Sequence, residues 1–137
     1  MIRNLYANDF QGMSNEVFEK LRTFGIQTTD ELIAKLNDPN VRRDVAQKTG
    51  VNEPELIKWT KMADLMRVSG VSKQYGELLF AAGVTSLEQL RGHKPEDLVR
   101  TLEQAHGNRK VFDTAPKLPE VQGWINEART LDTLVTV

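Results

Sequence analysis

The sequence predicts an all-α protein in which one short helical unit occurs twice. Apolar residues recur at helical spacing in short segments separated by glycines, and no segment in the body of the chain alternates as a strand does. The duplication is indicated by a match between residues from Gly12 onward and residues from Gly70 onward, at a shift of 58 positions. We therefore expect one compact domain over residues 1–137, with tandem repeats at about 12–67 and 70–131 and an extended tail at 132–137.

The stretch from Leu65 to Val84 organises this interpretation. It is typical of a helix end, a tight hairpin at Gly70-Val71-Ser72, and a second helix that Gly83 ends in a left-handed conformation. One apolar face of the second helix is formed by four residues at helical spacing: Tyr75, Leu78, Leu79 and Ala82. This pattern predicts two short helices that meet at a sharp turn.

The first repeat carries the same signals. At the shift of 58, Gly70, Ser72 and Gly83 of the central stretch fall on Gly12, Ser14 and Gly25. Each copy then continues with a helix-start signal, Thr28 with Glu31 and Ser86 with Gln89. Both pairs have the spacing of a capping box, in which side chains satisfy free N–H groups at a helix start.

A second correspondence relates residues 54–63 to residues 119–128, at a shift of 65. The shared pattern is Pro-Glu, an apolar residue, two residues, Trp, three residues and Ala, which places the apolar residue, the tryptophan and the alanine on one helix face. We expect Trp59 and Trp124 each to anchor its own repeat. The larger shift implies seven additional residues in the second copy, which we expect around His106 to Pro116, a stretch rich in charge and in helix breakers.

The combined signals predict helices near residues 14–24, 28–36, 40–48, 53–67, 72–82, 86–92, 95–105 and 119–130. The tail from Leu131 to Val137 alternates and favours β conformation, so we expect it to lie extended against the body or a partner. A frayed terminus is the alternative.

Short helices joined by glycine hairpins are typical of helix-hairpin-helix packing. Val68 to Ser72, followed by Gly76, Leu79 and Gly83-Val84, is similar to a helix-hairpin-helix motif. The lead-in at Ala63 to Arg67, the Thr49-Gly50-Val51 turn and the two Trp helices resemble a bacterial family of tandem helix-hairpin-helix domains of unknown function, from about Gly12 to Leu131. The resemblance implies an all-α, SAM-domain-like fold, whose relatives occur in DNA repair and polymerase proteins.

Composition excludes several classes of function. The chain has no cysteine, which excludes disulfides and thiolate chemistry and suits a reducing compartment. A formal net charge of −1 argues against general electrostatic capture of nucleic acid or anionic lipid. No apolar run approaches the ~20 residues that cross a bilayer. We expect a soluble, cytoplasmic protein with no membrane contact.

The two hairpins are candidates for binding phosphate. DNA-binding hairpins of this kind carry Gly-apolar-Gly, whereas both hairpins here have serine at the third position, where its side chain can cap its own helix. The second hairpin has a small excess of positive charge. If either hairpin binds nucleic acid, we expect the second to do so, through four residues: Arg67, Val71, Ser72 and Lys73.

The sequence does not predict an enzyme. His93 and His106 lie 13 positions apart without cysteines nearby, so we expect no metal site and no cofactor. No nucleophile elbow or phosphate loop is present in the sequence. Arg42 and Arg43 form another basic cluster, but the neighbouring acids are typical of a solvated face.

Apolar residues without an expected helical partner favour protein contact. Phe10 is one of them, and the candidates for contact with a partner are Phe80, Phe112, Leu134, Val135 and Val137. We therefore expect a binding or adaptor module that contacts another protein or its own copy. Weak, sequence-independent binding to DNA or RNA through the second hairpin is the alternative.

Overall fold

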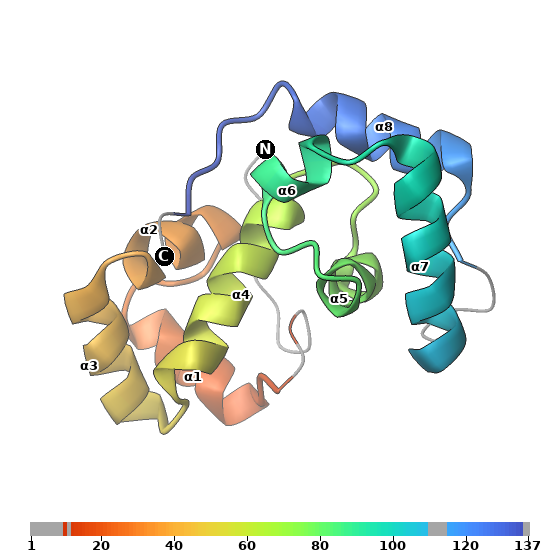
Figure 1. Ribbon diagram of the computed structural model, residues 1–137. Coiled ribbons are helices and arrows are strands. Elements are labelled where there is room, and N and C mark those ends of the chain that lie inside the picture. Colours follow the sequence, from red (N-terminus) through yellow and green to blue (C-terminus); the bar gives the residue numbers. More distant parts are fainter. Residues whose placement is uncertain (1–9, 11, 110–114, 136–137) are drawn as a thin grey trace. The chain divides into compact units, whose positions relative to one another are not determined.

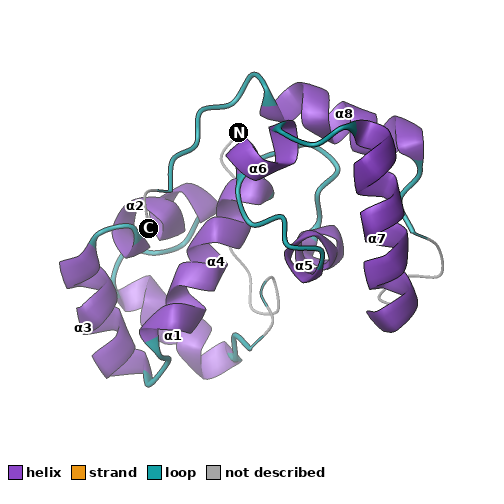
Figure 2. Ribbon diagram, in the orientation of Figure 1, coloured by secondary structure: helices purple, strands orange, loops and turns teal. Residues whose placement is uncertain are grey.

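Every regular element that the structure describes is a helix (Figure 2). The structure is a computed structural model and describes residue 10, residues 12–109 and residues 115–135, with the backbone alone at 108 and 109. The helices are α1 (Asn15–Thr23), α2 (Thr29–Leu36), α3 (Pro39–Thr49), α4 (Glu53–Leu65), α5 (Lys73–Ala81), α6 (Leu87–Arg91), α7 (Pro95–Arg109) and α8 (Leu118–Ala128). This confirms the all-α prediction. Within the described residues, no helix has the length and apolarity needed to span a membrane.

Seven of these helices begin and end within two residues of the predicted bounds, and α7 does not. It was expected to end near residue 105 and continues to Arg109, so His106 and Gly107 are helical rather than part of an inserted loop. Leu98 and Leu102, both fully buried, hold α7 in place. A single glycine near a helix end costs only about 1 kcal/mol, which is too little to stop the helix there.

The chain divides into two compact units. Unit 1 comprises Met1–Asp64 with Leu134–Val137, and unit 2 comprises Leu65–Thr133. Unit 1 therefore contains α1 to α3 and nearly all of α4, whereas unit 2 contains α5 to α8 (Figure 1). The division falls at the last residue of α4. Whether the two units act as one domain stays a prediction.

In unit 1, α1 and α2 pack against α3. Trp59 of α4 is 1% exposed, and its ring centroid lies 6.4 Å from that of Phe10. Phe10 is itself buried, so the expectation of an apolar residue without a partner was wrong at this position. The remaining core of the unit includes Leu21, Ile26, Leu32, Leu36, Val45, Leu56 and Met62.

In unit 2, α6 and α7 pack against α8, and α5 packs against α7. Trp124 of α8 is 3% exposed and its ring centroid lies 5.1 Å from that of Tyr75 on α5. Each tryptophan is thus buried within its own unit, as the sequence predicts. The remaining core includes Leu78, Leu79, Val84, Leu87, Leu90, Leu98, Leu102, Val121 and Ile125.

The turns before α1 and α5 have the same local geometry. Gly12 and Gly70 adopt φ of +88° and +87°. The N–H of the following residue donates to the carbonyl three positions back, Met13 to Phe10 and Val71 to Val68, both at 3.1 Å. Glycine is required because the third residue of such a turn has positive φ. The serine after each turn then caps its helix, as predicted.

The ends of α1 and α5 also match. Gly25 and Gly83 have φ of +80° and +87°. The N–H of Ile26 donates to Leu21 O at 3.1 Å, and that of Val84 to Leu79 O at 2.8 Å. Together with the glycine N–H bonds, these are the six-to-one and five-to-two bonds of a Schellman motif, which satisfies the last helical carbonyls. The left-handed stop predicted at Gly83 is confirmed.

The two predicted capping boxes differ. Thr28 Oγ1 accepts the Glu31 N–H at 3.1 Å, and the Glu31 carboxylate accepts the Thr28 N–H at 3.0 Å, which completes the first box. Ser86 Oγ likewise accepts the Gln89 N–H at 3.1 Å. The Gln89 side-chain oxygen, however, accepts the N–H and hydroxyl of Thr85. The prediction of a second capping box was therefore wrong for the bond from the Gln89 side chain to the Ser86 N–H. The Gln89 side-chain oxygen binds Thr85 instead, because Thr85 offers it two donors, its N–H and its hydroxyl.

Candidate functional site

Several hydrogen-bonding groups of the second hairpin are already bound to other groups of the same chain. The Val71 N–H, one of the groups expected to face a phosphate, donates instead to Val68 O. Ser72 is the N-cap of α5, and its Oγ accepts the Tyr75 N–H at 3.4 Å. These bonds close the turn and begin the helix, so fewer backbone donors point outward than in a turn with a second glycine.

A carboxylate from α8 lies against this hairpin. Glu127 Oε2 accepts the Ser69 N–H at 2.9 Å and the Ser69 hydroxyl at 3.3 Å. The carboxylate thus occupies a backbone donor beside Gly70 and places a negative charge where a phosphate would approach. Like charges at short range repel one another, which weakens the case for a phosphate site. The sequence gives no sign of this contact, because Glu127 falls on Met62 when the repeats are aligned.

The cations expected at the hairpin have different surroundings. Arg67 follows α4, and its Nη1 donates to the backbone carbonyl of Asp132 at 2.7 Å, so the guanidinium is engaged within unit 2. Lys73 is the first residue of α5 and is half-buried. All four predicted residues therefore lie at or beside the hairpin. Arg67, however, is hydrogen-bonded within unit 2, and Glu127, which was not predicted, lies beside them.

The second hairpin packs against aromatic side chains of unit 2. A Cβ at Gly70 would lie 3.3 Å from Trp124 Nε1, so the backbone at Gly70 is close to the indole. The Tyr75 ring packs against the same indole at an interplanar angle of 58°, and its hydroxyl is hydrogen-bonded to Glu120. Burial raises the pKa of Tyr75 above its ordinary value, and the charge of Glu120 and the hydrogen bond to it raise it further. Hairpin, α5 and α8 thus form one packed corner of unit 2.

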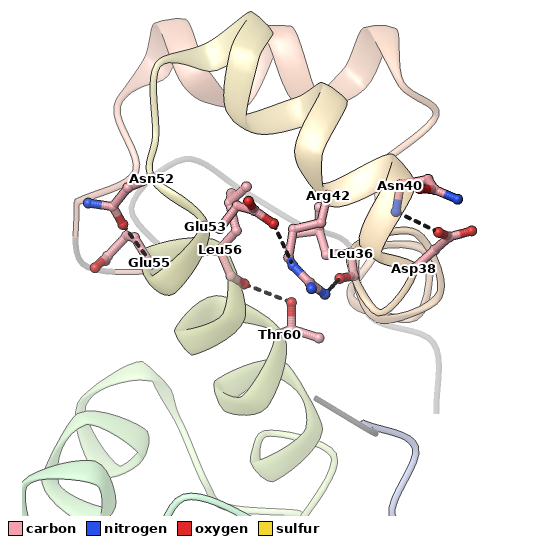
Figure 3. A network of polar contacts seen from close by, with 9 residues as sticks. All are labelled: Leu36, Asp38, Asn40, Arg42, Asn52, Glu53, Glu55, Leu56 and Thr60. Carbon is pink, nitrogen blue, oxygen red and sulfur yellow. Dashed lines mark hydrogen bonds and ion pairs between the residues drawn. The ribbon is translucent and has the colours of Figure 1, made fainter.

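The Arg42–Arg43 cluster is not a solvated face. The Arg42 side chain is buried, and its Nη1 donates to Leu36 O at 3.0 Å while Nε lies 3.4 Å from the Glu53 carboxylate (Figure 3). One guanidinium therefore joins the end of α2 to the start of α4 across α3. The expectation was wrong for Arg42, because its hydrogen-bonding partners come from two other helices, α2 and α4. Arg43 is exposed.

A shallow pocket of about 350 Å³ lies in unit 1, beside the last turns of α1 and α3. It is lined by Lys20, Thr23, Phe24 and Lys48. Lys20 is also paired with Glu16 at 3.2 Å. Both lysines lie at helix C-termini, where cations favourably offset the partial negative charge of the helix dipole. This role accounts for their position without a bound anion.

The predicted protein-contact residues are distributed over both units. Phe80 of unit 2 is half-buried and makes contacts within the structure. In unit 1, Leu134 is 43% exposed and Val135 is half-buried. Phe112 and Val137 lie outside the described residues. Leu118, the first residue of α8, is 39% exposed and was not predicted.

The tail residue Leu134 is bound at its backbone by two side chains of unit 1. Its N–H donates to Asp64 Oδ2 of α4 at 3.3 Å, and its carbonyl accepts from Asn37 Nδ2, at the end of α2, at 3.2 Å. Asp64 is only 1% exposed. We call Asn37 and Asp64 the backbone clamp. The described part of the tail, residues 132–135, has no regular secondary structure and lies against the body at this clamp.

The histidines have ordinary structural surroundings. His93 Nδ1 lies 2.7 Å from Gln89 O, so it caps a carbonyl at the end of α6, as expected for a histidine at a helix end. His106 is half-buried within α7. Across the described ranges, no group of three or more His, Cys, Asp or Glu side chains could hold a metal ion.

Residues 11–131 match the family model of a domain of unknown function, DUF4332. The chain belongs to this family. The match covers both hairpins and both tryptophan helices of the DUF4332 domain, over the same span in which the sequence resembles a family of unknown function. The backbone clamp lies within the match, whereas the tail residue that it binds lies beyond it.

Two curated relatives share part of this DUF4332 chain. Small ribosomal subunit protein uS2 of Methylobacterium nodulans (strain LMG 21967 / CNCM I-2342 / ORS 2060) is 34% identical over 104 residues. The protein of the same name from Methylobacterium sp. (strain 4-46) is 31% identical over 103 residues. Each alignment covers 73% of this chain and 27% of the relative, so the chain spans about a quarter of their length. No solved structure matches the chain.

Proposed function

We propose that this chain is a non-enzymatic binding or adaptor module that contacts another protein or a second copy of itself. We further propose that its two units are copies of one helix-hairpin-helix unit. The paired turns support this second point, because Gly12 and Gly70 share a conformation and a hydrogen-bonding pattern, as do Gly25 and Gly83.

The observation that carries the preference for a protein partner is the Glu127 carboxylate at the second hairpin. It occupies the Ser69 N–H at 2.9 Å, while Val71 N–H and the Arg67 guanidinium are bound by backbone carbonyls. Binding to a nucleic-acid backbone depends on free cations and on free N–H groups that approach phosphate. At the second hairpin, Arg67 and the N–H groups of Ser69 and Val71 are already hydrogen-bonded within the chain.

The relatives support a modular role. In the two uS2 proteins the similar segment is about a quarter of the chain, so a domain of this kind is carried by longer proteins. Leu134 and Leu118 offer exposed apolar side chains to a partner. Apolar side chains that are buried at the centre of an interface contribute strongly to association between proteins.

Nucleic-acid binding through the second hairpin is the alternative. It is favoured by the name of the relatives, which are proteins of the small ribosomal subunit. In this alternative Lys73 and the first N–H groups of α5 contact phosphate, and Arg67 leaves the carbonyl of Asp132 to join them.

Fluorescence anisotropy with labelled duplex DNA and double-stranded RNA separates the two functions. We expect the wild-type chain to leave the anisotropy unchanged at both about 50 mM and about 200 mM salt, because backbone binding would weaken steeply over that range. Lys73→Ala and Lys94→Ala are a matched pair, since Lys94 lies outside the hairpin. Binding at low salt that Lys73→Ala weakens and Lys94→Ala does not would replace the adaptor proposal with the alternative.

A further inference from the structure

The backbone clamp recognises the main chain of its occupant rather than a side chain. Asn37 donates to the carbonyl of Leu134 and Asp64 accepts from the N–H of the same residue, at 3.2 and 3.3 Å. Both polar groups of one backbone residue are therefore hydrogen-bonded by side chains of unit 1. Leu134 itself is 43% exposed. The two hydrogen bonds consequently place no requirement on the side chain of the residue that is bound.

The clamp is held in a fixed position by its own unit. Asp64 lies in the last turn of α4 and is 1% exposed. Asn37 is the C-cap of α2 and immediately precedes Asp38, the N-cap of α3. The neighbouring residues Leu36 and Ala63 are fully buried. A site whose supporting backbone is buried is preorganised, and little ordering cost remains when a peptide binds.

The occupant of the clamp comes from a distant part of the sequence. Leu134 lies 97 positions after Asn37 and 70 positions after Asp64. Between them the chain forms the whole of unit 2 before its last residues return to unit 1. The tail of another copy presents the same N–H and carbonyl. Exchange of an identical segment between copies is a low-cost route to a dimer, because the bonds lost within one chain are regained between two.

We propose that the backbone clamp is the site through which this chain associates with a second copy, by binding that copy's tail at Leu134 in place of its own. This inference rests on the proposed adaptor function and specifies its site and its partner. The chain's own tail competes for the same clamp. Because a tail on a short tether has an effective concentration on the order of millimolar, exchange becomes appreciable only as the protein approaches that concentration.

Light scattering of the full chain at increasing concentration tests the proposal with variants of Leu134 and Asp64. Leu134→Pro removes the N–H that donates to Asp64, whereas Leu134→Ala keeps this N–H and shortens only the exposed side chain. Because exchange between identical copies regains every bond that it breaks, the decisive comparison is a mixture of Leu134→Pro, which keeps Asp64, with Asp64→Ala, which keeps the N–H of Leu134. We expect this mixture to dimerise at a severalfold lower concentration than either variant alone, because only the mixed dimer regains the hydrogen bond, whereas Leu134→Ala in place of Leu134→Pro gains nothing from mixing. Equal dimerisation of the mixture and of each variant alone, or a monomer throughout, overturns the proposal.

A peptide experiment distinguishes the clamp from other sites of self-association. The probe is a peptide of residues 130–135, acetylated and amidated at its ends, titrated into the full-length Leu134→Pro chain and followed by amide chemical shifts. We expect shifts at Asn37 and Asp64, and a peptide carrying N-methyl-leucine at position 134 to lose roughly two- to tenfold in affinity, as the loss of about one hydrogen bond implies.

The outcomes of these tests are separable from those of the proposed function. Peptide binding at the clamp without dimerisation of the wild-type chain overturns a second copy as the occupant and points to a segment of another protein. Failure of both experiments overturns the clamp but leaves the adaptor function standing. Only nucleic-acid binding through Lys73 overturns the adaptor function itself.

Discussion

Gly70 illustrates how one residue of the turn serves two requirements. Its φ of +87° is unfavourable for any residue with a Cβ, and such an atom would also lie 3.3 Å from Trp124 Nε1. Gly83 has the same φ but open space around its missing Cβ. Substitution of Gly83 by alanine therefore measures the cost of the backbone conformation alone. The same substitution at Gly70 adds the cost of displacing the indole of Trp124.

The corresponding prediction compares Gly70→Ala with Gly83→Ala. We expect each to lower the free energy of unfolding by about 1–2 kcal/mol, the cost of a left-handed conformation for a residue with a Cβ. Gly70→Ala is expected to cost more than Gly83→Ala, because the indole must also move. Urea denaturation followed by tryptophan fluorescence measures the difference. An equal decrease in the free energy of unfolding in the two variants would mean that the indole of Trp124 can move aside without a cost in stability.

At the scale of the helices, a buried cation on α3 connects the end of α2 with the start of α4. Arg42 of α3 binds the carbonyl of Leu36 at the end of α2 and the carboxylate of Glu53 at the start of α4 (Figure 3). α3 itself is capped by Asp38, whose carboxylate accepts the Asn40 N–H at 2.9 Å. The guanidinium therefore fixes where three helix ends meet.

Arg42→Ala and Arg43→Ala form a matched pair on adjacent residues of α3. Loss of Arg42 leaves the carbonyl of Leu36 without this donor, and an unsatisfied buried polar group costs about 1–3 kcal/mol. We expect Arg42→Ala to lower the free energy of unfolding by that amount. Arg43 is exposed, so its removal is expected to stay within about 0.5 kcal/mol. Thermal unfolding by circular dichroism compares the two, and similar melting temperatures would contradict a structural role for Arg42.

Most helix boundaries could be predicted from the sequence because their causes are local. Ser14 and Ser72 cap helices whose first residues follow them directly, and Gly25 and Gly83 stop helices within one turn. The end of α7 could not be predicted this way, because a lone glycine does not outweigh the buried leucines before it. Arg42 was misjudged for a related reason, since its burial depends on partners from α2 and α4.

At the scale of the whole molecule, the candidate sites depend on contacts between residues that are distant in the sequence, which local sequence patterns do not predict. Glu127 reaches Ser69 across 58 positions, and Asn37 reaches Leu134 across 97. The glycine turn before α5 could be predicted from the sequence, but the side chains that bind this turn and Leu134 could not. The correspondence at a shift of 65 could not help with Glu127, because it places Met62, which has no carboxylate, at the equivalent position.

The last prediction concerns how the tail stabilises unit 1 in the full chain. Leu134 is hydrogen-bonded through its backbone to Asp64 and Asn37. Leu134→Pro removes the N–H of this pair and Leu134→Ala keeps it, so Leu134→Pro is expected to destabilise the surroundings of Asp64 and Asn37 more than Leu134→Ala does. Hydrogen exchange followed by mass spectrometry measures this in peptides from α2 and from the end of α4. Loss of about one hydrogen bond implies exchange roughly two- to tenfold faster in Leu134→Pro.

Peptides from α7 serve as the internal control, because this helix belongs to unit 2 and its contacts there are with α5 and α8. Faster exchange confined to unit 1 would show that the returning tail is a structural part of that unit. Faster exchange to the same extent in α7 would instead mean that the two units open together, so that the tail stabilises the chain as a whole. Unchanged exchange in α2 would mean that the two hydrogen bonds at Leu134 contribute nothing to stability in solution.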